Sequence, residues 1–317
     1  MPAVPPTHLD LLDRPLVAVL TTHQADGRLQ STVVWFGRDG EDLLVSTMAE
    51  FQKARNLSRR PRATVLIVAP EEEQRWIELR GEVTRDDGDA VALLDELTLR
   101  YTGTTPYFGA CVPAELAAVE HPVAFRLTPT TIVTGPGRPR PGAGDPPPLD
   151  RLPTLPPELP TPPPLPCGSP APRPPSDPGV DLPADHLDLF DRPLLAALST
   201  RLPDGSAQTQ PVWCCREGNH VLVSTTLERR KGRNLVADPR ATVLVVDPED
   251  TGRWTEVRGD VALVTQGAVD LLDRLTRAYT GRSRYYGDIA PEGFRDTETR
   301  VTVRLRPRRV VCDAVHR

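Results

Sequence analysis

Lysine is nearly absent from this chain, and its two lysines occupy equivalent positions. Lysine and arginine together number 38, but only Lys53 and Lys231 are lysines, and they lie 178 residues apart. A lysine ammonium is a compact point charge, whereas the arginine guanidinium is a wide planar fork, so the two are not interchangeable at a phosphate. The pattern therefore indicates a specific contact with a phosphate at the same position of each half.

The residues around each lysine are of types that bind phosphate. Two hydroxyl residues precede it at the end of an expected strand, and an arginine follows two positions later. A helix expected to begin near residue 51 adds free backbone N–H groups, which attract anions. The alternative is a basic helix face that points to solvent and survives from a duplication. The candidate residues are Ser46, Thr47, Lys53 and Arg55 in the first copy and Ser224, Thr225, Lys231 and Arg233 in the second.

Other polar residues recur without forming a recognisable catalytic set. His8 and His186 lie near the start of a short helix, where we expect them to be solvated. Arg80 and Arg258 lie on a strand and either bind a substrate carboxylate or form a structural ion pair. No His/Cys pair has metal-ligand spacing, and no Ser-His-Asp order repeats. We therefore predict neither a metal site nor catalytic acid–base residues.

Several aromatic residues also recur. Trp35 and Trp213 stand at a strand end, where they either flank a bound ring or fill the core, and Trp76 and Trp254 are expected in the core. The tyrosine pairs, expected at a pocket mouth or at a helix end, are Tyr101 with Tyr279 and Tyr107 with Tyr285.

All these pairs belong to one repeat with a fixed offset of 178. His-Leu-Asp-Leu-Leu-Asp-Arg-Pro-Leu at 8–16 reappears at 186–194 with one change, and Tyr-Thr-Gly at 101–103 reappears at 279–281. We predict two domains, 5–134 and 183–312, joined by a linker at 135–182. Residues 135–183 hold 20 of the 37 prolines, a composition typical of a solvated spacer rich in polyproline II.

The elements expected within each unit are mostly strands. In the first unit Thr7 is the expected N-cap of a short helix, and further helices are expected at 51–58 and 87–101. The helix at 87–101 should bury Val91, Leu94, Leu97 and Leu99. Turns are expected at 25–28 and 38–41. Six or seven antiparallel strands with few helices indicate a mostly β fold, a small barrel. The expected strands are 16–22, 29–36, 42–47, 63–68, 76–85, 123–127 and 131–134.

The order Ser-Thr, Lys-x-Arg-Asn-Leu and Pro-Arg-Ala-Thr-Val-Leu resembles a known family. It is similar to the split β-barrel flavin-binding proteins related to pyridoxamine 5′-phosphate oxidase. It looks most like the actinobacterial branch that uses the deazaflavin coenzyme F420, including the F420-dependent biliverdin reductases. The resemblance covers both units but not the linker. It implies two barrels packed as a pseudo-dimer within one monomeric chain, with coenzyme F420, or FMN as the alternative, at their interface.

The resemblance also implies which residues bind the coenzyme. The phosphate contacts map onto the candidates named above together with Asn56 and Asn234, and the strand beside the ring system maps onto 32–35 and 210–213. The ring-side residues are Val34 and Trp35 in the first copy and Pro211, Val212 and Trp213 in the second.

The two copies differ at this strand. Only the second has Pro211, whereas the first has Thr32 and Val33 in this region. Proline lacks a backbone N–H and so changes the hydrogen bonding beside the ring. We therefore predict two unequal sites, with one coenzyme bound tightly per chain.

Two functions of different classes remain open. The first is an oxidoreductase that transfers hydride between the coenzyme and a small organic acceptor, since a coenzyme carries this chemistry and asks little of the protein. The second is a non-catalytic flavin- or haem-binding module that stores or senses its ligand.

Composition excludes several partners. The net charge is −5, and no apolar run approaches the roughly 20 residues of a membrane-spanning helix, so we expect neither nucleic acid nor a membrane as a partner. The N-terminal residues lack the basic and apolar segments of a signal peptide, and the five cysteines do not recur between the copies. We therefore expect a cytoplasmic protein.

Overall fold

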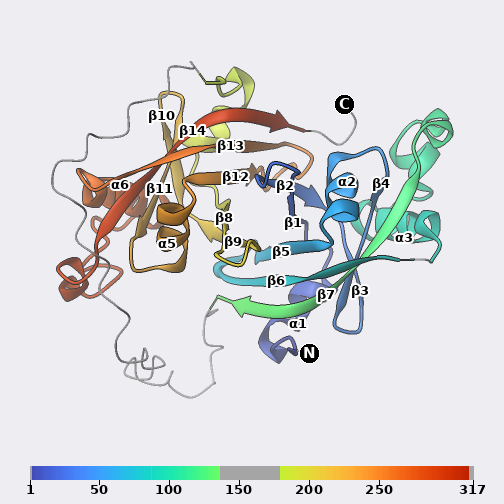
Figure 1. The fold of residues 1–317 in the computed structure, drawn as a ribbon, viewed down its shortest axis with the longest axis horizontal. Helices are drawn as coiled ribbons and strands as arrows, with labels where there is room; N and C mark the ends of the chain where they lie inside the picture. The colour runs from blue at the N-terminus through green and yellow to red at the C-terminus, as the bar shows by residue number, and fades with distance from the viewer. Residues whose placement is uncertain (1, 87, 136–178, 314–317) are drawn as a thin grey trace.

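The chain forms two copies of one mostly β fold (Figure 1). The computed structural model describes residues 2–86, 88–135 and 179–313. The first sheet has the strand order β2-β1-β5-β6-β7-β4-β3, and the second, read from its far end, has the equivalent order β9-β8-β12-β13-β14-β11-β10. All neighbouring strands are antiparallel. The predicted class, two split β-barrels packed within one chain, is confirmed.

The first half holds seven strands and two longer helices. Its helices are α1 (Leu9–Asp13), α2 (Gln52–Arg59) and α3 (Ala90–Thr102). Its strands are β1 (Ala18–His23), β2 (Leu29–Val34), β3 (Gly37–Asp39), β4 (Asp42–Met48), β5 (Arg62–Ala69), β6 (Glu72–Asp86) and β7 (Pro122–Thr134).

The second half repeats this arrangement. Its helices are α4 (Asp188–Asp191), α5 (Arg230–Ala237) and α6 (Ala268–Thr280). Its strands are β8 (Ala196–Arg201), β9 (Ala207–Val212), β10 (Cys214–Glu217), β11 (His220–Thr226), β12 (Arg240–Val246), β13 (Trp254–Val264) and β14 (Arg300–Cys312).

The closing strand differs from its expectation. Two short strands were expected at 123–127 and 131–134, but β7 runs through both, because a bulge takes up Thr130 while Pro129 stays paired with Gly81. Gly81 faces this bulge, and a Cβ added there would lie 2.1 Å from the carbonyl oxygen of Thr128. Proline is tolerated in a strand at such irregularities, where no ladder N–H is needed.

The helix expected at 87–101 forms as α3 but buries fewer residues than its pattern suggested. Asp89 caps it by accepting hydrogen bonds from the amides of Val91 and Ala92. Leu94 and Leu97 are buried as predicted, but Val91 and Leu99 are exposed. Because α3 covers only one edge of the barrel, a single stripe of its surface is buried.

The recurring histidines correct a second expectation. His8 and His186 are buried rather than solvated, and their Nε2 atoms lie 3.0 Å from the carbonyl oxygen of Gly135 and 2.9 Å from Asp313 Oδ2. Each histidine therefore ties the start of its unit to the end of the same unit. The helix that follows begins at Leu9 without a side-chain cap, so Thr7 is not an N-cap.

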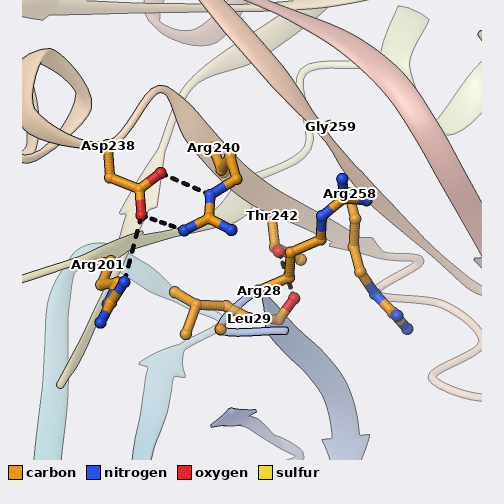
Figure 2. A pocket seen from close by; sticks show the side chains of 10 residues that line it. Arg28, Leu29, Arg201, Asp238, Arg240, Thr242, Arg258 and Gly259 are labelled. Carbon is orange, nitrogen blue, oxygen red and sulfur yellow. Dashed lines mark hydrogen bonds and ion pairs between the residues drawn. The ribbon is translucent and has the colours of Figure 1, made fainter. Parts of the chain in front are cut away.

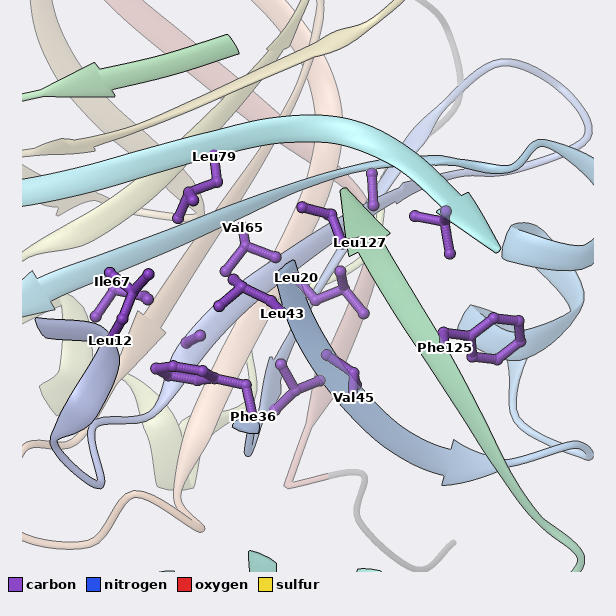
Figure 3. Close-up of a cluster of buried hydrophobic side chains, with 14 of the residues drawn as sticks. Leu12, Leu20, Phe36, Leu43, Val45, Val65, Ile67, Leu79, Phe125 and Leu127 are labelled. Atoms are coloured by element: carbon purple, nitrogen blue, oxygen red, sulfur yellow. The ribbon is translucent and has the colours of Figure 1, made fainter. Parts of the chain in front are cut away.

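Each barrel encloses its own core. In the first half, Leu20, Phe36, Leu43, Val65 and Leu79 are almost wholly buried and come from different strands or strand ends (Figure 3). An equivalent core fills the second half, formed by residues such as Leu198, Val223, Val243 and Val303.

The two halves contact each other through buried polar groups. Glu78 accepts a 2.6 Å hydrogen bond from the amide of Thr209 in the other half and is also held by Arg80. The equivalent arrangement in the second half is formed by Glu256, Ser31 and Arg258. Arg80 and Arg258 are therefore members of structural ion pairs. Four hydroxyls, 2.9–3.1 Å apart, also meet here, from Thr21, Ser31, Ser199 and Thr209.

An apolar cluster shared by the halves surrounds these polar groups. It includes Leu66 from the first half and Ala197, Leu244 and Trp254 from the second. The interface is thus buried like a dimer interface, although one polypeptide supplies both sides. Residues 136–178 of the predicted proline-rich linker lie outside the described residues. Among the residues described, no helix is both long and apolar enough to cross a membrane.

Candidate functional site

A cleft opens on each side of the interface, and each cleft takes residues from both halves. The larger has a volume of about 600 Å³ and combines the second barrel with residues 71–76 of the first. The smaller, of about 160 Å³, combines the first barrel with residues 251–254 of the second. The two are equivalent under the 178-residue repeat, so they are related by the internal symmetry of the fold.

Lys231 lies in the larger cleft, which we call the second-half cleft. Helix α5 begins at Arg230, after the loop that follows β11, and both Lys231 and Ser224 line the cleft. The hydroxyl of Ser224 is buried and has no hydrogen-bond partner among the described residues. Burial, and after it the charges of Arg229 and Arg300, lower the pKa of Lys231 to about 8.

Two further cations complete this wall. Arg229 and Arg300 both line the cleft. Arg300 is only 7% exposed, and its guanidinium is held by Glu298 at 2.7 Å and by the hydroxyl of Tyr286. It also lies 5.4 Å from the ring of Tyr285. This arginine is therefore held in place before any ligand arrives.

The ring-side residues predicted for the second copy lie in the same cleft. Pro211, Val212 and Trp213 line it at the end of β9. Trp213 stacks on Tyr279 at 5.2 Å between ring centroids, and the hydroxyl of Tyr279 donates to the carbonyl oxygen of Leu194 at 2.6 Å. The tryptophan is thus both a wall of the cleft and part of a fixed aromatic pair.

The smaller cleft, which we call the first-half cleft, contains the equivalent residues in a tighter space. Ser46, Thr47, Lys53, Val34 and Trp35 all line it. Burial lowers the pKa of Lys53 to about 8.

Substitutions between the copies explain the difference in size and charge. Phe51 stands where the second half has Arg229, Met48 replaces Thr226, and Pro122 replaces Arg300. The second-half cleft therefore presents three cations, whereas the lining of the first-half cleft has Lys53 as its single cation.

Some of the predicted phosphate contacts do not line either cleft. Arg55 and Arg233 are exposed on the outer face of their helices, because residues two positions apart do not share a helix face. Asn56 is buried and donates to Thr22 at 3.0 Å and to Gln30 at 2.8 Å, and Asn234 makes the equivalent bonds. Thr225 is buried and is absent from the residues that line the second-half cleft.

Sequence reasoning missed several residues of the clefts. Trp254 is buried in the apolar cluster between the halves and Trp76 packs against that cluster, as expected of core residues, but each also lines the cleft of the opposite barrel. Their recurrence was visible in the sequence, but their contact with the other half was not. Arg300 had no signal of this kind, since its counterpart is a proline.

A second pair of interfacial cavities lies elsewhere. In one, of only about 10 Å³, Asp238 binds Arg240 at 2.7 Å and approaches Arg201 at 3.8 Å (Figure 2). In the equivalent cavity, of about 190 Å³, the buried His23 forms part of the lining. Arg60, which stands at the position of Asp238 in the repeat, is not among the residues that line it. The small cavity has room for about one water and no larger ligand.

The fold and the paired clefts define a tandem split β-barrel protein with ligand clefts at the barrel interface. A family model described as pyridoxamine 5′-phosphate oxidase matches residues 4–133 and again 182–311. The chain belongs to the pyridoxamine 5′-phosphate oxidase family, with two family domains in one polypeptide. No curated protein matches the chain.

Solved structures similar to this chain each correspond to about one of its halves. A structure titled F420 reductase is 30% identical, has a TM-score of 0.36 and aligns over 41% of this chain and 98% of its own. A conserved hypothetical protein of Mycobacterium tuberculosis is 24% identical, with a TM-score of 0.34 and coverage of 42% and 84%. A heme storage protein from Vibrio cholerae is 16% identical, with a TM-score of 0.33 and coverage of 41% and 93%.

Proposed function

We propose that this protein is an oxidoreductase that binds one phosphorylated coenzyme, F420 or FMN, in the second-half cleft and transfers hydride between it and a small organic acceptor. The observation that carries the proposal is the set of donors on one wall of a 600 Å³ cleft: Lys231, Arg229 and Arg300, with the unpartnered hydroxyl of Ser224. Family membership supports the coenzyme class, and the motif around Lys231 favours F420.

The donors fit a phosphate group. Lysine and arginine side chains donate hydrogen bonds and a serine hydroxyl can donate one, and a phosphate supplies several oxygens that accept charge-assisted hydrogen bonds. Ser46, Thr47 and Lys53, with Arg55, Arg233, Thr225, Asn56 and Asn234, remain candidates from the motif, but the second-half cleft has the greater volume and three cations on one wall.

The other side of the cleft fits a flat ring system. Trp213 and Pro211 from one half face a cleft that also contains Trp76 from the other half. Pro211 has no backbone N–H to donate. An acceptor at the edge of the ring would therefore have to receive its hydrogen bond from residues next to Pro211. Because both halves contribute walls, the cleft would position the ring of the coenzyme at the interface and exclude water from one face of it.

When bound, the coenzyme supplies hydride to the acceptor or receives it, and the protein residues bind and orient both molecules. Glu71 and Glu72 from the first half also line the cleft, and Glu71 is bound to Arg14 with its pKa lowered to about 2, chiefly by that hydrogen bond. Glu71 is therefore ionised at neutral pH and does not act as a proton donor.

Calorimetric titration of the full chain with FMN and with F420 tests the proposal. We expect one tight site, and we expect Lys231→Ala to weaken it by about 1.5–3 kcal/mol, the range for a hydrogen bond to a charged group. The matched control is Lys53→Ala, which should leave the tight site intact. Two equal sites, or equal losses in the two variants, would contradict a single coenzyme cleft. A tight complex that no acceptor oxidises would instead favour a flavin-storing or flavin-sensing module.

The same titration with haem addresses the remaining alternative. Among the residue types that usually bind haem iron, the second-half cleft offers only tyrosines, Tyr279 and Tyr285. We therefore expect haem to bind more weakly than the phosphorylated coenzymes.

A further inference from the structure

The first-half cleft has the wrong size and lining for a phosphorylated coenzyme. Its volume of about 160 Å³ is about a quarter of that of the second-half cleft and below the roughly 300 Å³ at which pockets for drug-sized ligands begin. Most of its lining is apolar, with Trp35, Met48, Phe51 and Leu94 among the residues. A ligand of this cleft has to be small and largely apolar.

The polar atoms of this cleft are nevertheless left without partners. Thr47 and Trp254 are 4% and 2% exposed, and Thr47 Oγ1 and Trp254 Nε1 have no hydrogen-bond partner among the described residues. Within residues 2–86, 88–135 and 179–313, no carboxylate forms an ion pair with Lys53, whose ammonium lies 5.4 Å from the centre of the Phe51 ring. Buried polar groups are nearly always paired in folded proteins, so Thr47 and Trp254 each lack a partner, and the partly exposed Lys53 lines the same cleft.

The chemistry of the three groups identifies the partner. An ammonium and an indole N–H can only donate, and a hydroxyl can do so as well. The missing group is therefore an acceptor, and the positive charge of Lys53 favours an anion. A phosphate dianion would need more positive charge than one lysine, and the positions of Arg229 and Arg300 are occupied here by Phe51 and Pro122.

We propose that the first-half cleft binds a small aromatic carboxylate, with the carboxylate at Lys53, Thr47 and Trp254 and the ring among the apolar residues. The site is separate from the coenzyme cleft and does not depend on the proposed oxidoreductase activity. The repeat has thus produced two clefts with different ligands, one for a phosphorylated coenzyme and one for an aromatic monoanion.

Benzoate is a suitable probe for the full chain in the absence of any coenzyme. We expect one saturable site by calorimetry, with affinity reduced about tenfold or more in Lys53→Met, which keeps the length of the side chain and removes its charge. The matched control, Lys231→Met, should bind benzoate as the unaltered protein does. Benzyl alcohol, which has the ring without the charge, should bind at least about tenfold more weakly than benzoate.

The indole signal of Trp254 gives a second readout that needs no change at Lys53. In protein labelled with ¹⁵N at tryptophan, the Nε1 resonance that disappears in Trp254→Phe should shift when benzoate is added. No saturable binding, equal affinity in Lys53→Met, or an unmoved Trp254 resonance would overturn the proposal. So would displacement of benzoate by FMN in direct competition, because the cleft would then be a second coenzyme site.

Discussion

At the scale of single residues, the number of cations distinguishes the two clefts. Burial first, and then the charges of Arg229 and Arg300, lower the pKa of Lys231 to about 8, while Glu78 opposes them. An anion that binds next to a lysine of lowered pKa raises that pKa again, because it favours the charged form of the side chain. A bound phosphate therefore stabilises the charged form of Lys231.

The pH dependence of coenzyme binding follows from this arrangement. In the free protein Lys231 has a pKa of about 8, so it is mostly protonated only below pH 8, and a bound phosphate raises that pKa. Affinity should therefore be greatest below pH 8 and fall as the pH rises above 8. Titrations at a series of pH values check this, and Lys231→Arg should bind more weakly yet lose this dependence, since arginine stays charged. Equal dependence in the variant would assign the effect to another group.

The residue types that were rare in the sequence proved the most informative. Lys53 and Lys231 stood out because arginine supplies all the other positive charge, and both line clefts. Arg300 could not be found by the same search, since a repeat reveals only what both copies share. A comparison of the two copies therefore does not single out the residues that make the two clefts different.

At the scale of elements, the bulge opposite each Arg-Gly pair sets the geometry of the interface. The register shifts between Arg258 and Gly259 and places the chain of β14 against the glycine. Arg258 then reaches back to Glu256, which holds the amide of Ser31 in the other half. The bulge thus connects the bend of one sheet to the docking of the two barrels.

Replacing Gly259 by alanine should therefore destabilise the protein. The added Cβ would lie 2.0 Å from the carbonyl oxygen of Arg306, so backbone has to move, and overpacking of this kind costs about 1–3 kcal/mol. The free energy of unfolding from denaturant titration measures the loss. Gly293→Ala is the control, because a Cβ there meets no atom within 4 Å. Similar values for the two variants would show that β14 relaxes without cost.

Most elements were predictable because their patterns are local. The alternation of apolar residues and the turn sequences predicted the strands before β6 to within a few residues, apart from the short β3. The error at β7 arose because Pro129 interrupts a strand pattern, and only the partner strand, with Gly81 opposite, makes a bulge possible. Which residues of α3 are buried depended likewise on how much of the helix the barrel covers.

At the scale of the whole molecule, the interface brings charges of both halves around one histidine. His23 is 5% exposed, and burial first, then Arg60, Arg201 and Arg62, lower its pKa to about 4, while Asp204 opposes them. The histidine is therefore neutral in the folded protein near pH 7. Its protonation is tied to the docking of the halves, since Arg201 and Asp204 belong to the second half.

Stability should consequently fall as the pH is lowered. The unfolded chain binds a proton at His23 near pH 6.5 and the folded chain only near pH 4, so between these values the unfolded state binds more protons. This group alone should cost about 2 kcal/mol between pH 7 and pH 5. Denaturant titrations of the protein and of His23→Gln at both pH values measure the difference. A variant with the same loss on acidification would exclude His23 as the source.

Separating the halves is the strongest test of the pseudo-dimer. A second half alone, residues 183–313, would expose Leu244 and Trp254 and leave Glu256 without the amide of Ser31. In a homodimer of that half, Thr209 stands at the position equivalent to Ser31, so each Glu256 regains a partner amide, and the central hydroxyls are supplied by Ser199 and Thr209.

We therefore expect a stable homodimer by light scattering, whereas the full chain should be a monomer. Because each copy carries Lys231, Arg229 and Arg300, the homodimer should bind two coenzymes with similar affinity. A well-folded monomeric half would show that neither the apolar cluster nor the buried carboxylate requires the second barrel.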